Sequence, residues 1–237
     1  MRKRNIELYV PWLLLMAYGL VIYLLDAKGG DLWLAKVFYQ WQGNQWLLRD
    51  HWLTEQILHK GARVVNYLML LTVLALTVLM WRTHGRQSYQ SRAYFALFVS
   101  LLTSFILIAL LKSLTNKACP WNLQLFGGIE PYYHLLQSRP ASLPPSQCFP
   151  AGHASVGYAW VALFYFFSQV KPHLRWFGLG TGLITGLILG LNQQLRGAHF
   201  LSHDVTTLFL CWLVATSWFR LLYRTAGEDI AMSSAQR

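Results

Sequence analysis

The sequence predicts an all-α membrane protein, a polytopic membrane helical bundle with six transmembrane helices. Hydrophobic residues make up 55% of the 237 residues, whereas charged residues make up only 12%. A helix needs about 20 largely apolar residues to cross a bilayer, and the chain holds several such runs separated by polar segments. We expect a single integral membrane domain over residues 1–237, with spans at 8–25, 62–81, 93–114, 153–170, 176–192 and 204–223.

Individual spans carry further patterns. No small-residue cleavage site follows the first span before Asp26, so we expect it to stay in the membrane and not to be removed as a signal peptide. The second and third spans are the most uniformly apolar. The fifth carries glycines at a small-xxx-small spacing, which favours close packing against a neighbouring helix. Residues 225–237 are expected to form a disordered tail.

Two long segments connect spans on the outer side of the predicted membrane. The proline-rich loop 115–152 joins the third span to the fourth, and the segment 26–61 joins the first to the second. A Trp-rich amphipathic run in 26–61 predicts one or two helices lying against the membrane surface. Its apolar residues are Leu32, Trp33, Val37, Phe38, Trp41, Trp46 and Leu47. The carboxylates of this segment are expected to be ordinary exposed loop charges: Asp26, Asp31, Asp50 and Glu55.

The distribution of Lys and Arg predicts which side of the membrane is cytoplasmic. With the N-terminus inside, eleven basic residues lie in short cytoplasmic segments and seven are spread over the longer outer segments. We therefore expect both termini in the cytoplasm of a bacterium, and the outer segments in the periplasm beyond its inner membrane. The net charge of +11 then reflects topology and attraction to anionic lipid head groups. No nucleic-acid partner is expected.

Ionisable residues gather at one predicted membrane depth. They come from three separate segments: Lys112; Gly152 and His153; and Arg196, His199, His203 and Asp204. Such groups are costly to place at the edge of a membrane span and usually mark a functional site. Packing alone does not explain why independent segments deliver them together, so we expect a catalytic or binding site there.

The order and spacing of these residues resemble the type 2 phosphatidic acid phosphatase superfamily of membrane-bound lipid phosphatases. That family's signature is Lys-x6-Arg-Pro, then Pro-Ser-Gly-His, then Ser-Arg-x5-His-x3-Asp. The three blocks here read Lys112-Ser-Leu-Thr-Asn-Lys-Ala-Cys119-Pro120, Pro150-Ala-Gly-His153 and Gln193-Gln-Leu-Arg-Gly-Ala-His199-Phe-Leu-Ser-His-Asp204. The signature is degenerate: Cys119 and Gln193 stand where the family has arginine, Ala151 replaces serine, and Asp204 comes one residue late.

The resemblance implies roles for these residues. His199 would be the nucleophile that forms a phosphohistidine, and His153 would protonate the leaving oxygen. A carboxylate would orient His199, and we expect Asp204 to do so, with His203 as the alternative partner. The phosphate-binding residues would be Lys112, Arg196, Gly152 and Gln193, with Arg139 as a weaker candidate. No metal or cofactor is implied, although His199 and His203 at i, i+4 also resemble a metal-binding pair.

Cys119 and Cys148 flank the outer loop, next to the first and second blocks. In an oxidising periplasm they would form a disulfide, and the alternative is two free thiols. The expected function is removal of phosphate from a lipid or polyprenyl (di)phosphate at the outer face of the membrane. Two alternatives stay open: a lipid phosphotransferase, and a non-catalytic phospholipid-binding scaffold. The residues do not identify the lipid or the oligomeric state.

Overall fold

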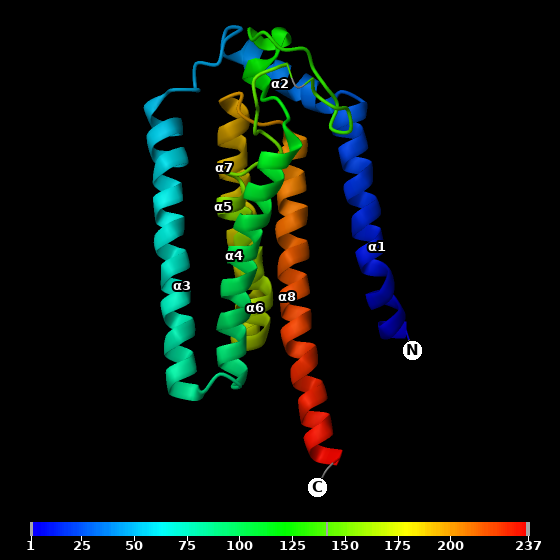
Figure 1. The fold of residues 1–237 in the computed structure, drawn as a ribbon, viewed down its shortest axis with the longest axis vertical. Helices are drawn as coiled ribbons and strands as arrows, with labels where there is room; N and C mark the ends of the chain where they lie inside the picture. Colours follow the sequence, from blue (N-terminus) through cyan, green and yellow to red (C-terminus); the bar gives the residue numbers. More distant parts are fainter. Residues whose placement is uncertain (1, 141, 236–237) are drawn as a thin grey trace.

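The computed structural model describes residues 2–140 and 142–235, and within those ranges it contains helices and no β-strand (Figure 1). In chain order the α-helices are α1 (Arg2–Ile22), α2 (Gly30–Trp41), α3 (Ala62–His84), α4 (Tyr89–Thr115), α5 (Ser155–Tyr158), α6 (Ala162–Val170), α7 (Arg175–Leu195) and α8 (Leu201–Ala235). Two π-helical segments, η1 (Tyr23–Ala27) and η2 (Leu53–Gly61), precede α2 and α3. Short 3₁₀ turns complete the set: η3 (Pro120–Asn122), η4 (Gln124–Phe126), η5 (Ala159–Val161) and η6 (Pro172–Leu174).

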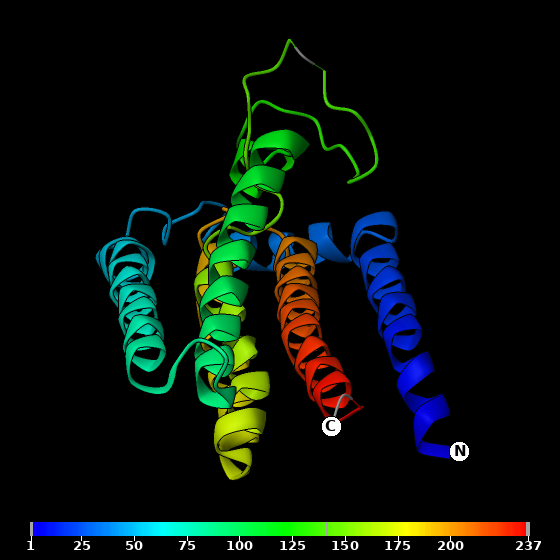
Figure 2. The ribbon, with the colours of Figure 1, turned by 60° about the horizontal axis from the view of Figure 1, so that its bottom comes forward.

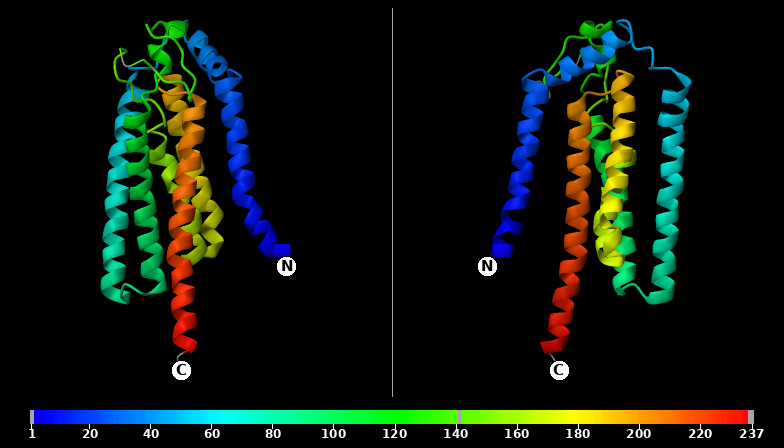
Figure 3. Two further views of the ribbon diagram at one scale, coloured as in Figure 1. Left: turned by 45° about the vertical axis from the view of Figure 1, so that its right-hand side comes forward. Right: turned by 180° about the vertical axis from the view of Figure 1, so that it is seen from behind.

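The long helices stand side by side as a bundle, with α4 packed against α3, α6 and α8 (Figure 1). α1 stands at one edge of the bundle and contacts α8. α2 crosses the outer end of the bundle, as the two views in Figure 3 show. The irregular loop after α4 projects beyond the helix ends (green in Figure 2). The polar residues predicted to form the site therefore lie where the helices meet this loop.

The glycines of α7 pack against the backbone of the α5–α6 segment, as their spacing predicted. A Cβ on Gly182 would lie 2.4 Å from the nitrogen of Val161, and one on Gly186 would lie 2.1 Å from the ring of Tyr158. Both distances are far below van der Waals contact, so no larger residue fits without moving the helices apart. This close contact fixes the start of α5 next to the end of α7.

Four described helices are long and apolar enough to cross a membrane: Leu53–His84, Tyr89–Asn122, Pro172–Leu195 and Leu201–Tyr223. The pair Trp12–Ala27 and Gly30–Trp41, bent by 56°, gives a fifth if it counts as one span. The chain is an integral membrane protein, but six spans are not confirmed. The expected span 153–170 is the shorter apolar helix Ser155–Val170, which reaches only about 24 Å against a hydrocarbon core of about 30 Å.

The outer segment 26–61 contains the expected surface helix, α2, which exposes Trp33 and Trp41 and buries Asp31 and Ala35. Its second half differs from a surface helix, because η2 continues directly into α3. The end of the chain also differs from the expected disordered tail, since α8 continues as helix to Ala235. No proline follows Pro172, so nothing in the backbone interrupts α8. Residues 236–237 of the expected tail lie outside the described residues.

Candidate active site

A cavity of about 850 Å³, here called the central cavity, opens at the outer end of α3, α4 and α7. Six of the predicted catalytic or phosphate-binding residues line it: Lys112, Gly152, His153, Gln193, Arg196 and His199. Cys119 and Cys148 also line it. The structure therefore brings together residues from all three sequence blocks, and these residues come from several different helices and loops.

His199 lies in the turn between α7 and α8, where Gly197 has φ +72°, a value that favours glycine. Its Nδ1 lies 2.7 Å from the backbone carbonyl oxygen of Cys148. A carbonyl only accepts hydrogen bonds, so Nδ1 carries the proton and Nε2 keeps its lone pair. Burial lowers the pKa of His199 well below its usual value, and the nearby His203 and Lys112 lower it further. His199 is therefore a neutral imidazole, the form that can act as a nucleophile.

Asp204 does not orient His199, contrary to the expectation. Its carboxylate accepts a hydrogen bond from Gln194 and faces α7, where a Cβ on Gly190 would lie 2.6 Å from Oδ2. Asp204 is not part of the lining of the central cavity. α8 begins at Leu201, so His199 lies in the turn before the helix, and Asp204 lies in the first turn of α8 with its carboxylate against α7. His203, four residues after His199, lies nearer, with Nδ1 3.5 Å from Nδ1 of His199.

His153 and Lys112 also line the central cavity. The Nε2–H of His153 donates to the carbonyl of Leu58 at 2.7 Å, and its Nδ1 is buried without a partner in the described chain. Burial lowers the pKa of His153 to about 4, so the imidazole is neutral near pH 7. The side chain of Lys112 passes Gly152 so closely that a Cβ there would lie 3.3 Å from Cδ and 3.4 Å from Nζ.

Several donors in the central cavity have no acceptor. Within the described residues, no hydrogen bond or ion pair occupies the ammonium of Lys112, nor the backbone N–H groups of Gly152 and His153. The side-chain Nε2 of Gln193 is also buried and unpartnered. Of these donors, only the Nε2 of Gln193 is a buried side-chain atom without a partner in the described residues, whereas Lys112 and Gly152 are half-buried and face the cavity. Together these donors form an arrangement that is suited to an anion.

Arg196 reaches the central cavity, but its three guanidinium nitrogens are already engaged. Nε donates to the carbonyl of Arg49 at 2.8 Å, Nη1 donates to Oε1 of Gln193 at 3.2 Å, and Nη2 pairs with Glu55. Glu55 is thus not an ordinary exposed loop charge. The positive charge that the sequence predicted for phosphate binding is neutralised by a carboxylate from η2.

The structure places Arg139, the weaker candidate for phosphate binding, outside the lining of the central cavity. Its Nε and Nη2 donate to Oε2 of Glu130 at 2.9 and 2.6 Å, and its Nη1 donates to Asn116 at 3.0 Å. Both side chains of the ion pair are almost fully buried, and Arg139 does not line the central cavity. The pair lies within the outer loop, where it holds residues 130 and 139 together.

The structure joins Cys119 to Cys148 by a disulfide across 29 residues. The bridge lies beside the site, and Cys148 is also the residue whose carbonyl fixes the proton on His199. No group of three or more His, Cys, Asp or Glu side chains that could hold a metal ion occurs in the part of the chain that the structure describes.

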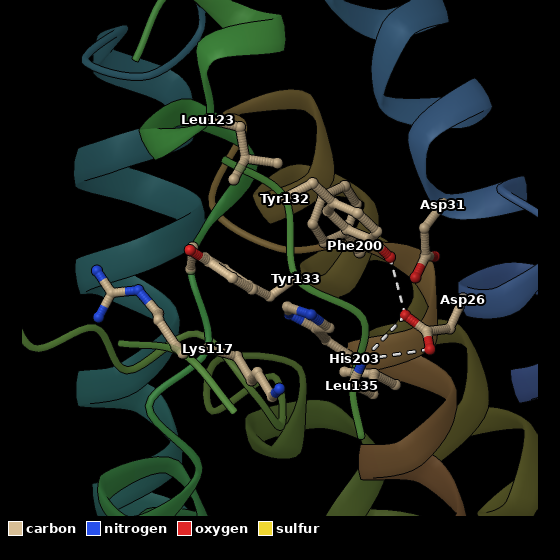
Figure 4. Close-up of a pocket in the computed structure, with 11 residues that line it drawn as sticks. Asp26, Asp31, Lys117, Leu123, Tyr132, Tyr133, Leu135, Phe200 and His203 are labelled. Carbon is tan, nitrogen blue, oxygen red and sulfur yellow. Dashed lines mark hydrogen bonds between the residues drawn. The ribbon is translucent and has the colours of Figure 1, made fainter. Parts of the chain in front are cut away.

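Two further carboxylates expected to be exposed are instead buried, and they line a separate small pocket with Phe200 and His203 (Figure 4). Asp31 accepts from the backbone N–H of Ser202 at 2.9 Å, at the start of α8. Asp26 accepts from the hydroxyl of Tyr132 at 2.8 Å and from the backbone N–H of Leu135, as the dashed lines in Figure 4 show. α2 and η1 thereby fix the start of α8 and the outer loop relative to each other.

Sequence reasoning missed three residues of η2 and α3 that surround the site. Glu55, His59 and Arg63 follow one another at four-residue spacing, and His59 and Arg63 line the central cavity. The π-helical segment that carries two of them is rare and is often found at functional sites. The signal in the sequence was this polar stripe at helical spacing, directly before an apolar span.

The fold resembles that of a solved structure described as the crystal structure of the first transmembrane PAP2 type phosphatidylglycerolphosphate phosphatase from Bacillus subtilis. The two chains share 16% identity, the match covers 93% of this chain and 97% of that one, and the TM-score is 0.56. No curated protein matches the sequence significantly. The family model of the PAP2 superfamily matches residues 93–226, more than half of the chain and all three sequence blocks. The chain therefore belongs to the PAP2 superfamily.

Proposed function

We propose that the protein is a lipid phosphatase that removes a phosphate from a lipid or polyprenyl (di)phosphate through a phosphohistidine at His199, without a metal ion. The observation that carries this proposal is the state of His199. Its Nδ1 proton is held by the carbonyl of Cys148, so the lone pair on Nε2 is free in a cavity with an unpaired lysine. A neutral, oriented imidazole beside free cationic and N–H donors is suited to attack a phosphate.

In the first step, Nε2 of His199 attacks the phosphorus, the P–N bond forms and the bond to the leaving oxygen breaks. Phosphoryl transfer depends mainly on positioning and on stabilising charge on the equatorial oxygens. Lys112, the N–H groups of Gly152 and His153, and Nε2 of Gln193 are the free donors for those oxygens. Gln193 contributes a neutral amide where the family has an arginine.

His153 would protonate the leaving oxygen in that step. Its pKa of about 4 leaves it neutral near pH 7, but a bound phosphate anion favours the protonated form and raises the pKa. In the second step a water molecule attacks the phosphorus and gives its proton to His153, the P–N bond breaks, and neutral His199 is restored. One histidine thus acts as acid and then as base.

The shape of the central cavity favours a substrate with an apolar tail. Besides the polar site, its lining includes apolar or aromatic side chains from α3 and α4: Tyr67, Leu70, Leu102, Phe105 and Ile108. A phosphate at the polar end would leave the tail of its lipid beside the bilayer. The structural neighbour is described as acting on phosphatidylglycerolphosphate, and that lipid belongs in the set to be tested here.

The proposed location is the inner membrane of a bacterium, with both termini in the cytoplasm and the central cavity open to the periplasm. The Lys and Arg distribution supports this orientation. The disulfide between Cys119 and Cys148 supports it independently, because disulfides persist in oxidising compartments such as the periplasm.

The test is release of inorganic phosphate by the purified protein in detergent with EDTA. Substrates should include phosphatidic acid, phosphatidylglycerophosphate, undecaprenyl diphosphate and lipid A phosphates. We expect release from at least one of them, and none from His199→Ala. Transfer of phosphate to a second lipid without free phosphate would identify a phosphotransferase. Binding of a lipid phosphate without release of phosphate would identify a scaffold, and loss of activity in EDTA would contradict a metal-free mechanism.

A further inference from the structure

The family blocks of this chain supply fewer free cations to the central cavity than the family signature, which has one lysine and two arginines. Cys119 lies in the disulfide and Gln193 is a neutral amide, so neither position where the family has arginine supplies a guanidinium. Arg196 is engaged through each of its three nitrogens, including the ion pair with Glu55. Within those blocks, Lys112 is left as the free cation that lines the cavity.

Arg63 lies outside those blocks and lines the same cavity, together with Lys112 and His153. It belongs to the first turn of α3, at the outer end of a membrane span. Among the described side chains, no carboxylate lies within ion-pair distance of its guanidinium. Arg63 is exposed, so the missing counter-charge alone says little. What distinguishes it from an ordinary surface arginine is its place in the cavity lining beside Lys112 and His153, where its guanidinium can meet an anionic ligand.

A chain of hydrogen bonds holds Arg63 in this position. Nδ1 of His59 lies 3.1 Å from Oε2 of Glu55, and Nε2 of His59 lies 3.2 Å from Nη2 of Arg63. The imidazole therefore donates to the carboxylate through Nδ1 and accepts from the guanidinium through Nε2. The ring of His59 also packs edge-on against the ring of His153, with 4.6 Å between centroids. Arg63 is thereby kept next to the histidine proposed as general acid.

We propose that Arg63 binds the substrate phosphate in the central cavity and supplies the guanidinium that positions 119 and 193 lack. The identity of the ligand as a substrate phosphate rests on the proposed function, whereas the position of Arg63 in the cavity does not. A guanidinium can hold two phosphate oxygens in a fork, whereas the ammonium of Lys112 acts as a point charge. The two side chains, from α3 and α4, would approach the phosphate from different helices.

The experiment measures two quantities for the purified full-length protein in detergent. The first is the Kd of orthovanadate, a phosphate analogue, by isothermal titration calorimetry. The second is the KM for a short-chain lipid phosphate, and kcat is obtained from the same rates. Arg63→Gln should raise both Kd and KM about ten-fold or more, and Arg63→Lys should raise them about three-fold, because it keeps the charge but loses the fork. Arg82→Gln, an exposed arginine near the other end of α3, is the matched control and should leave both unchanged.

A rescue variant strengthens the test. Gln193→Arg in the Arg63→Gln background should recover part of the lost vanadate affinity, since it restores a guanidinium to the cavity. If Arg63→Gln binds vanadate within two-fold of the wild-type protein, the proposal is wrong. If Arg63→Gln does not fold, Arg63→Lys decides the question, and wild-type affinity in that variant also overturns the proposal.

The proposed function can fail separately. A wild-type protein that binds vanadate through Arg63 but releases no phosphate from any lipid would refute the phosphatase and leave the role of Arg63 standing. If the wild-type protein hydrolyses a lipid phosphate and Arg63→Gln has the same KM, the phosphatase stands and the role of Arg63 is refuted.

Discussion

Replacing Arg139 with methionine should destabilise the protein without weakening its affinity for phosphate. The side chains of Arg139 and Glu130 are 1% and 2% exposed, so the variant leaves a buried carboxylate without its partner. Breaking a buried ion pair on one side costs about 3–5 kcal/mol. For a chain of this length, each kcal/mol lowers Tm by about 2–4 °C, so we expect a decrease of about 6–20 °C.

The assay is thermal unfolding in detergent, followed by tryptophan fluorescence, for the wild-type protein, Arg139→Met, and Arg139→Met combined with Glu130→Leu. The double variant should recover much of the lost stability, because it removes the unpaired charge. KM for a lipid phosphate, measured below the Tm of each variant, should stay unchanged. A raised KM at unchanged Tm would show that Arg139 binds phosphate after all, as the sequence suggested.

Three further predictions concern the site itself. Replacing Cys119 and Cys148 with serine should lower the free energy of unfolding by about 3–4 kcal/mol in the chain-entropy model. It should also lower kcat, because the carbonyl of Cys148 that orients His199 is no longer held in place. An unchanged kcat would show that the disulfide does not contribute to catalysis. Burial lowers the pKa of His153 to about 4, against about 6.5 when unfolded, so the unfolded state binds more protons between these values. The contribution of His153 to the free energy of unfolding should be complete above about pH 6.5 and decrease as the pH falls towards 4. The check is Tm measured against pH for the wild-type protein and for His153→Gln. The same decrease of Tm with falling pH in both proteins would contradict this prediction. His153→Ala should also slow hydrolysis of an alkyl phosphate more than that of an activated aryl phosphate, and equal losses would show that His153 only binds phosphate.

The parts of the site that follow from local spacing could be predicted from the sequence. Lys112 lies in the last turn of the long apolar helix α4, and His153 precedes the shorter apolar helix Ser155–Val170, so both were expected near a membrane face. The glycines of α7 predicted its close packing for the same kind of reason, since a fixed spacing along one helix determines one face.

The parts that depend on long-range pairing could not be predicted. Arg196 pairs with Glu55 across 141 residues, and nothing in either segment alone indicates the other. In the structure the partner of Nδ1 of His199 is the backbone carbonyl of Cys148, whereas Asp204 accepts from Gln194. Backbone groups leave no mark on the sequence, so a triad inferred from side chains alone omits them.

The most direct test of the proposed mechanism is to trap the phosphorylated enzyme. The protein, and a His153→Ala variant in which hydrolysis of the intermediate should be slow, would be mixed with a ³²P-labelled lipid phosphate and quenched under alkaline conditions. We expect an acid-labile, base-stable label that mass spectrometry places on His199 and that is absent from His199→Ala. Turnover of the lipid by the wild-type protein with no label on His199 in either form, or with full activity in His199→Ala, would contradict the phosphohistidine mechanism.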